Sequence, residues 1–99
     1  MFVAMSRFTV ANGMLDPVRK AFRERPHLVD GATGFLRMDV ISPHLAPAEF
    51  WLLTYWTDEE SYREWHKSHA YHDSHSGIPK GLKLVPSSAR IEFFDHIAS

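Results

Sequence analysis

The sequence predicts an α+β fold, with four antiparallel strands and two helices in the ferredoxin-like order β-α-β-β-α-β. Four segments have strand character, because they alternate apolar with polar residues or are rich in β-branched and aromatic ones; they cover residues 2–10, 35–41, 50–56 and 89–97. Between them, two segments repeat apolar residues at helical spacing. The length of 99 residues fits a single domain, residues 1–99.

The first strand and helix are separated by Asn12-Gly13, a typical turn pair. The helix is indicated by apolar residues at i, i+3 and i+7, namely Leu15, Val18 and Phe22. Pro26 cannot continue a helix, so we expect the chain to leave helical geometry at Arg25. Phe22 is expected in the core.

The second half begins with a turn between Gly31 and Gly34. In the strand that follows, alternation places Leu36, Met38 and Val40 on one face. Residues 50–56 are nearly all apolar, which predicts a strand buried on both faces. Thr57 and Glu60 have the spacing of a capping box, so a helix should start at about Asp58. Residues 75–90 read as a long irregular connection.

The apolar residues of this sheet predict a homodimer. Two helices cover one face of a four-stranded sheet, yet the first, third and last strands carry large apolar residues on both faces. A single copy would leave an extensive apolar surface in water. A second copy packed sheet to sheet would cover it.

Composition excludes several classes of function. The net charge of -1 gives no long-range attraction to nucleic acid or to an acidic membrane. The absence of cysteine excludes disulfides, thiolate nucleophiles and iron–sulfur ligation. No apolar run is long enough for a membrane span, and the first residues lack a signal-peptide pattern. A soluble cytoplasmic protein is expected.

Residues 55–75 hold two of the three tryptophans and four of the seven histidines. These histidines recur every third residue, which raises a zinc or nickel site; a solvated helix surface explains them more simply, since three-residue steps drift around a helix. The four are His66, His69, His72 and His75. In the first strand, Ser6 stands alone among apolar neighbours, and its hydroxyl either bonds to nearby backbone or points into a pocket.

Several motifs together resemble one family, the antibiotic biosynthesis monooxygenases (ABM), which are dimeric α+β barrels. They are Phe22-Arg23-Glu24-Arg25, Gly34-Phe35, Leu52-Leu53-Thr54-Tyr55-Trp56, and Trp65-His66-Lys67-Ser68 followed by His75. The resemblance extends over nearly the whole chain. It is nearest to the haem-degrading monooxygenases of that family, and it implies an enzyme.

The resemblance also implies a set of site residues. In the haem-degrading members a helix histidine ligates the iron, a helix tryptophan pushes the macrocycle out of plane, and a first-strand asparagine faces the distal oxygen. These positions match His75 as the axial ligand of haem iron, Trp65, and Ser6 in place of the asparagine. The serine hydroxyl is shorter than a carboxamide and would need a bridging water. Phe22 and Arg25 match pocket-lining positions, with Arg25 pairing a propionate.

Helical spacing alone would pair Trp65 with His69 or His72 rather than with His75.

The family resemblance leaves three functional hypotheses. The first is oxidative opening of bound haem by dioxygen, with an electron-donating reductase as partner. The second is a cofactor-free oxygenase of a polyketide-like or quinol substrate, using His72 or His75 as base. The third is a non-catalytic dimeric module for a small planar aromatic ligand.

Overall fold

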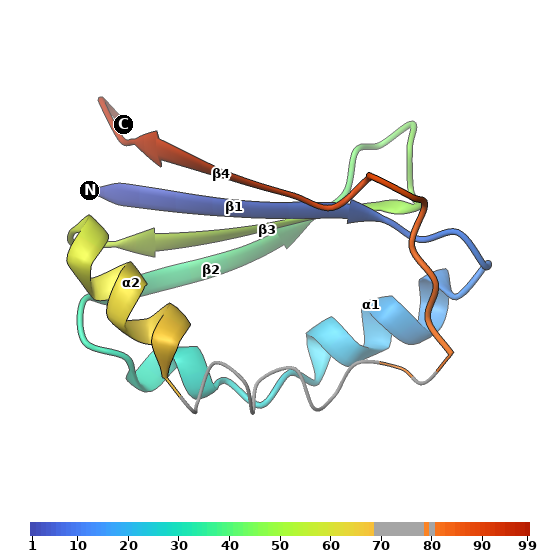
Figure 1. The fold of residues 1–99 in the computed structure, drawn as a ribbon, viewed down its shortest axis with the longest axis horizontal. Coiled ribbons are helices and arrows are strands. Elements are labelled where there is room, and N and C mark those ends of the chain that lie inside the picture. The colour runs from blue at the N-terminus through green and yellow to red at the C-terminus, as the bar shows by residue number, and fades with distance from the viewer. Residues whose placement is uncertain (69–78, 80) are drawn as a thin grey trace.

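The computed structural model describes residues 1–68, 79 and 81–99, and it confirms the predicted element order. The elements are β1 (Phe2–Thr9), α1 (Leu15–Arg23), the short 3-10 helix η1 (Leu28–Gly31), β2 (Phe35–Ile41), β3 (Glu49–Trp56), α2 (Glu59–Lys67) and β4 (Arg90–Asp95). The strands form one antiparallel sheet in the order β2-β3-β1-β4. Both α-helices and η1 lie on the same side of it (Figure 1). Within the described ranges, no helix has the length and apolar character needed to cross a membrane.

The strand register assigns each residue of the sheet to one of two faces. Ser6 pairs with Leu52 on one side and with Ile91 on the other, so these three side chains form a row on the face that the helices cover. We call this the helix face. Leu53 and Glu92, which both pair with Met5, belong by strand alternation to the opposite side, the open face.

The core beneath the helix face is divided into two clusters. The first lies below α2 and η1, where Trp56 is fully buried together with Phe2, Ala4, Val29 and Trp65. The second lies below α1 and is built on Val10, Val18 and Phe50. Because these clusters are separate, the described residues of the helix layer are not packed continuously between α1 and α2.

Two local expectations were wrong. The capping box of Thr57 and Glu60 does not form; Asp58 is the N-cap residue, and its carboxylate accepts a 2.8 Å hydrogen bond from the Ser61 backbone N–H. Asp58 offers a charged acceptor at the positive end of the helix, which explains why it takes this role. On β2, a register irregularity between Phe35 and Arg37 leaves Leu36 half exposed, while Phe35 packs on the core instead.

Gly34 closes the turn that places α2 over the sheet. Its φ of +79° lies in the left-handed region, and its carbonyl accepts a 2.9 Å hydrogen bond from the Thr57 N–H. A β-carbon at this position would lie 2.6 Å from Ser61 Cβ. The turn therefore needs glycine both for its backbone angles and for the close approach of α2.

Arginines stack on aromatic rings across the open face. The guanidinium of Arg7 lies 5.4 Å from the Trp51 ring, and that of Arg37 lies 4.5 Å from the Tyr55 ring.

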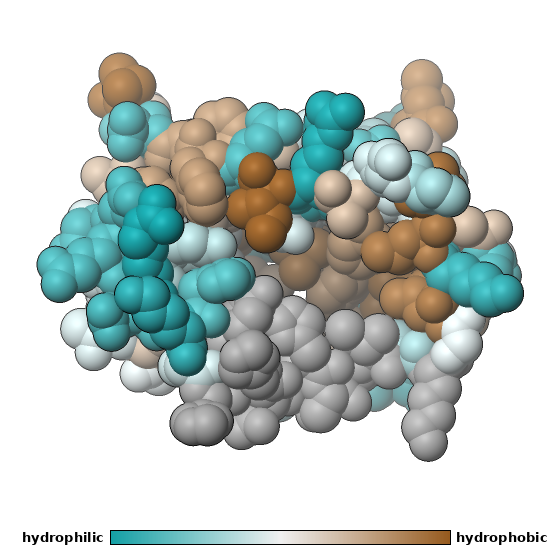
Figure 2. All heavy atoms as spheres, viewed as in Figure 1, coloured by the Kyte–Doolittle hydropathy of each residue, from teal (hydrophilic) through white to brown (hydrophobic). Residues whose placement is uncertain are grey.

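The third strand, β3, is less buried than predicted. Phe50 and Trp56 are buried, while its residues on the open face are only partly buried. Apolar and polar side chains are mixed along the upper edge of the molecule, where β4 runs (Figure 2).

Candidate functional site

A cavity of about 370 Å³ lies between the helix face and the helix layer, at the gap between the two core clusters. Its lining includes members of both clusters, with Ala4 and Trp65 from the first and Val18 from the second. The described part of the lining is mostly apolar. Such a space suits a ligand with a flat hydrophobic body and a few polar groups.

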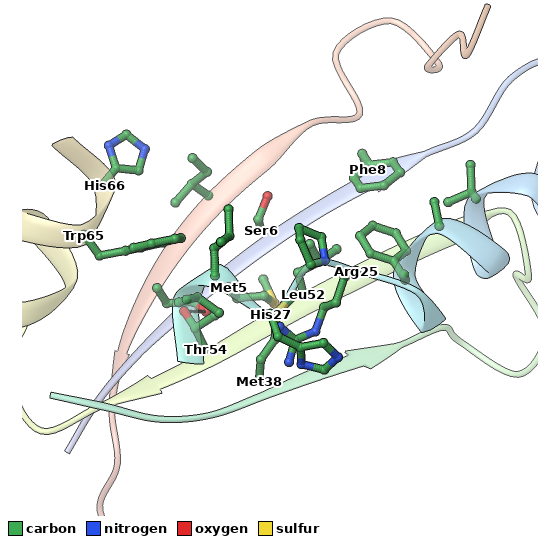
Figure 3. A pocket seen from close by; sticks show the side chains of 18 of the residues that line it. Met5, Ser6, Phe8, Arg25, His27, Met38, Leu52, Thr54, Trp65 and His66 are labelled. Atoms are coloured by element: carbon green, nitrogen blue, oxygen red, sulfur yellow. Dashed lines mark hydrogen bonds between the residues drawn. The ribbon is translucent and has the colours of Figure 1, made fainter. Parts of the chain in front are cut away.

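The sheet wall of this cavity carries two hydroxyl groups, those of Ser6 and Thr54. Thr54 is already engaged, because its Oγ1 accepts a 2.8 Å hydrogen bond from Trp56 Nε1. The Ser6 hydroxyl has no hydrogen-bond partner among residues 1–68, 79 and 81–99. Of the two interpretations of Ser6, the structure thus supports the pocket-facing one (Figure 3).

The α2 wall is aromatic. Trp65 lies near the end of α2 and is 9% exposed, and its indole reaches from the helix towards the cavity (Figure 3). Tyr62 precedes it by three residues, so both rings leave the helix on the side that meets the sheet. His66 also lines the cavity, with its ring centroid 5.7 Å from that of Tyr62.

A charged group stands at the rim, where the chain leaves α1. Arg25 and His27 both line the cavity, and both contact the carboxylate of Asp30: Arg25 Nη1 lies 3.2 Å from Oδ1 and His27 Nδ1 lies 3.2 Å from Oδ2. Partial burial by itself would raise the pKa of Asp30, but the hydrogen bonds and charges of Arg25 and His27 hold this pKa below its ordinary value. Asp30 is therefore a carboxylate at neutral pH.

The structure brings together four of the five site residues expected from the sequence. Ser6, Phe22, Arg25 and Trp65 come from three different segments and all line the same cavity. His75 lies outside the described residues. The same holds for His69 and His72, so the metal hypothesis for the histidine run stays a prediction; of its four histidines only His66 is described, and it lines the cavity.

Sequence reasoning missed His27 and Asp30. His27 adopts left-handed backbone angles, with φ of 57°, immediately before η1, and this turn folds Asp30 back onto the end of α1. A histidine in that conformation is uncommon, and no glycine occupies this position to indicate a left-handed turn in the sequence. The pair Pro26-His27 after a helix was the available signal, because it marks a forced change of direction.

The sequence profile of the antibiotic biosynthesis monooxygenase family matches residues 1–77, most of the chain. The chain belongs to the antibiotic biosynthesis monooxygenase family. No curated protein matches its sequence.

Solved structures agree on the fold of this ABM protein. The haem degrader MhuD from Mycobacterium tuberculosis, with two haems bound in its active site, superposes with a TM-score of 0.80 at 21% identity, over 100% of this chain and 98% of that one. SnoaB, a cofactor-independent oxygenase from Streptomyces nogalater, gives 0.76 at 15% identity, over 99% and 94%. A putative ABM protein from Bordetella bronchiseptica gives 0.80 at 10% identity, over 98% and 97%. At these identities the likeness shows the fold alone.

Proposed function

We propose that this ABM protein binds haem in the cavity described above and opens the ring oxidatively with dioxygen and electrons from a reductase. The observation that carries the proposal is the convergence of Trp65, Ser6 and Arg25 on one mostly apolar cavity. They supply an aromatic surface for a flat ring, a sheet hydroxyl that bonds to none of the described residues, and a cation at the rim. The solved haem-bound relative of the same fold supports the choice of haem.

Each residue has a distinct role in this proposal. His75 would hold the iron through its imidazole. Trp65 would pack against the ring, and its own position is fixed by the core cluster to which it belongs. Ser6 would offer its hydroxyl to the bound ligand, directly or through a water. Phe22 would contact the ring, and Arg25 would pair with a carboxylate.

The polarity and charge of the described lining residues are suited to haem. Its porphyrin is flat and apolar and its propionates are anionic, and the cavity combines an apolar lining with Arg25 and His27 at one side. When bound, haem supplies the iron centre at which dioxygen is reduced. The protein contributes the apolar lining, the orientation of the ring by Trp65, and the hydroxyl of Ser6.

Hemin titration of the purified protein tests the proposal. We expect a Soret band that saturates at a stoichiometric ratio in the wild type, that is lost in His75→Ala, and that persists in His44→Ala. His44 is the matched control because it is an exposed histidine in the loop before β3. Absence of a saturable band in the wild type would refute haem binding.

A cofactor-free oxygenase reaction is the second candidate, favoured by the imidazole of His66 in the cavity wall and by the shared fold with SnoaB. An enclosed apolar site with a histidine base suits deprotonation of an electron-rich phenol, whose anion then reduces dioxygen. Oxygen uptake with an anthrone-type substrate, without added hemin, would support this reaction. A protein that gives neither response fits the third hypothesis, a non-catalytic module for a planar ligand.

We also infer that the working form is a homodimer joined through the open face and β4. The exposed fractions of Ile91, Phe93 and Phe94 are 53%, 47% and 44%, so the edge strand presents large apolar residues on both faces. A second copy packed on this surface would remove them from water.

A further inference from the structure

The ion pair at the cavity rim has an unusual position. Arg25 is part of the cavity lining. The exposed fraction of its side chain is 20%, against 46% for the side chain of Asp30. Asp30 itself is outside the lining. The anion therefore stands behind the cation, on the solvent side, and the cation is the member that a bound ligand would meet.

Asp30 takes up only part of the hydrogen-bonding capacity of Arg25. A guanidinium has five N–H donors, and among the described residues the hydrogen bond to Asp30 uses one, on Nη1. The remaining donors have no side-chain partner in the described part of the chain and can meet a ligand. The charge of Arg25, however, is already balanced, because its guanidinium and the Asp30 carboxylate carry opposite unit charges.

We propose that Asp30 is an internal counter-ion that limits how tightly the cavity holds acidic ligands. The ligand class is a planar aromatic molecule with a carboxylate that reaches Arg25. Such a carboxylate gains hydrogen bonds from Arg25 and is repelled by the Asp30 carboxylate, which the backbone hydrogen bond from the Asp30 N–H to the His27 carbonyl holds in place. Asp30 thus acts through Arg25, as a residue that sets the charge of the rim.

This inference rests on the proposed function in taking the cavity as the ligand site, but it does not require haem or iron. The role of Asp30 predicts how the cavity discriminates between acidic and neutral ligands. In the wild type, an acid and its neutral ester should differ little in affinity, since the rim presents donors without net positive charge. Removing the Asp30 charge should favour the acid alone.

The experiment measures dissociation constants by fluorescence titration for anthracene-2-carboxylate and for its methyl ester. The full chain is compared with Asp30→Asn, Arg25→Gln and the double variant. Asparagine can still accept from Arg25, so this change removes charge while keeping the contact. Glu59→Gln is the matched control, because it removes one carboxylate from another arginine pair, with Arg63 on α2, outside the cavity lining.

We expect Asp30→Asn to bind the acid about three- to tenfold more tightly, the range for a partly exposed charge pair, and the ester unchanged. The gain should shrink as salt is raised, and it should be smaller in the Arg25→Gln background, where the carboxylate is no longer held beside Asp30. Glu59→Gln should leave both constants as in the wild type.

Weaker acid binding in Asp30→Asn, an equal change for acid and ester, or no binding of either probe would overturn the inference. The first two results would leave the haem proposal intact. Conversely, the expected pattern with the anthracene probes, together with a failed hemin titration, would refute haem binding while supporting the role of Asp30.

Discussion

The Ser6 hydroxyl is the polar group through which the sheet wall can meet a ligand, because the neighbouring Thr54 hydroxyl already binds the Trp56 indole. Strand alternation fixes this orientation: Ser6 shares its face with Ala4 and Phe8, which pack on the core clusters. Its chemistry is limited by reach, since the polar atom of a serine side chain lies one bond closer to the backbone than those of asparagine.

Ser6→Asn is therefore expected to speed ring opening of bound haem by roughly three- to tenfold, because a carboxamide replaces a water-mediated contact with a direct one. The rate is measured from the decay of the Soret band under air with ascorbate as reductant. Ser6→Ala is the paired variant and should be no faster than the wild type. Equal rates in all three proteins would show that residue 6 does not contact the reacting side of the ring.

At this scale the sequence predicts much of the site. Alternation in the first strand points Ser6 inwards, and helical spacing places Trp65 beside Tyr62, so local periodicity alone brings these side chains to the helix face. Asp30 could not be predicted in the same way. Its position depends on the left-handed angles of His27, and no pattern of apolar residues encodes that turn.

Among the elements, α2 depends most on its ends. Its N-terminus is held by the Asp58 carboxylate, and the hydrogen bonds from Ser61 lower the pKa of Asp58 from its ordinary value. The contribution of Asp58 to stability is therefore complete above the pKa of the unfolded chain, about 3.9, and is lost as the pH falls through the lower folded value.

Replacing Asp58 by alanine should lower the melting temperature by a few degrees at pH 7, because an orphan helix N–H loses its partner. The difference from the wild type should narrow once the pH drops below the folded pKa of Asp58. Asp58→Asn keeps an acceptor without the charge, so its melting temperature should depend less on pH in the acid range. Melting curves followed by circular dichroism between pH 2 and 7 check both expectations; a gap that widens in acid would contradict the cap assignment.

The turn at Gly34 makes a second prediction for this element. Gly34→Ala should destabilise the fold by about 2 kcal/mol or more, because alanine is strained at positive φ and its methyl group would collide with Ser61. Gly13→Ala is the control: Gly13 has φ of +71° but no atom within 4 Å of the added methyl, so only the backbone cost of about 1 kcal/mol is expected. Urea unfolding of both variants measures the difference. Equal losses would show that α2 does not approach Gly34 closely.

The order of elements was predictable, since each has its own apolar period, while their ends and irregularities were less so. The Leu36 prediction failed because one register irregularity reverses the faces at the start of β2. The cap of α2 was assigned one residue too early because Thr57 and Asp58 are both good cap residues, and only the path of the backbone decides between them.

For the whole molecule, the open face is the surface that the single chain leaves uncovered. Leu53 lies at its centre, paired with Met5 on β1 and with Asp39 on β2. Charged side chains surround this apolar centre, among them Arg7, which pairs with Glu92 at 3.6 Å. An apolar centre with a polar margin is the usual plan of a protein interface.

Leu53→Glu should therefore convert the proposed dimer into monomers at micromolar concentration, as sedimentation velocity would show. Leu45→Glu serves as the control, because Leu45 is 93% exposed in the loop before β3 and its replacement should leave the dimer intact. A wild-type protein that sediments as a folded monomer would refute the dimer outright.

The strand order β2-β3-β1-β4 also bears on how this chain is made. The first strand, β1, lies inside the sheet, and one of its two neighbours, β4, begins only at Arg90. On the ribosome, β1 must therefore wait with an open edge until Arg90–Asp95 has emerged. Such distant pairing slows folding and exposes the waiting strand to nascent-chain chaperones.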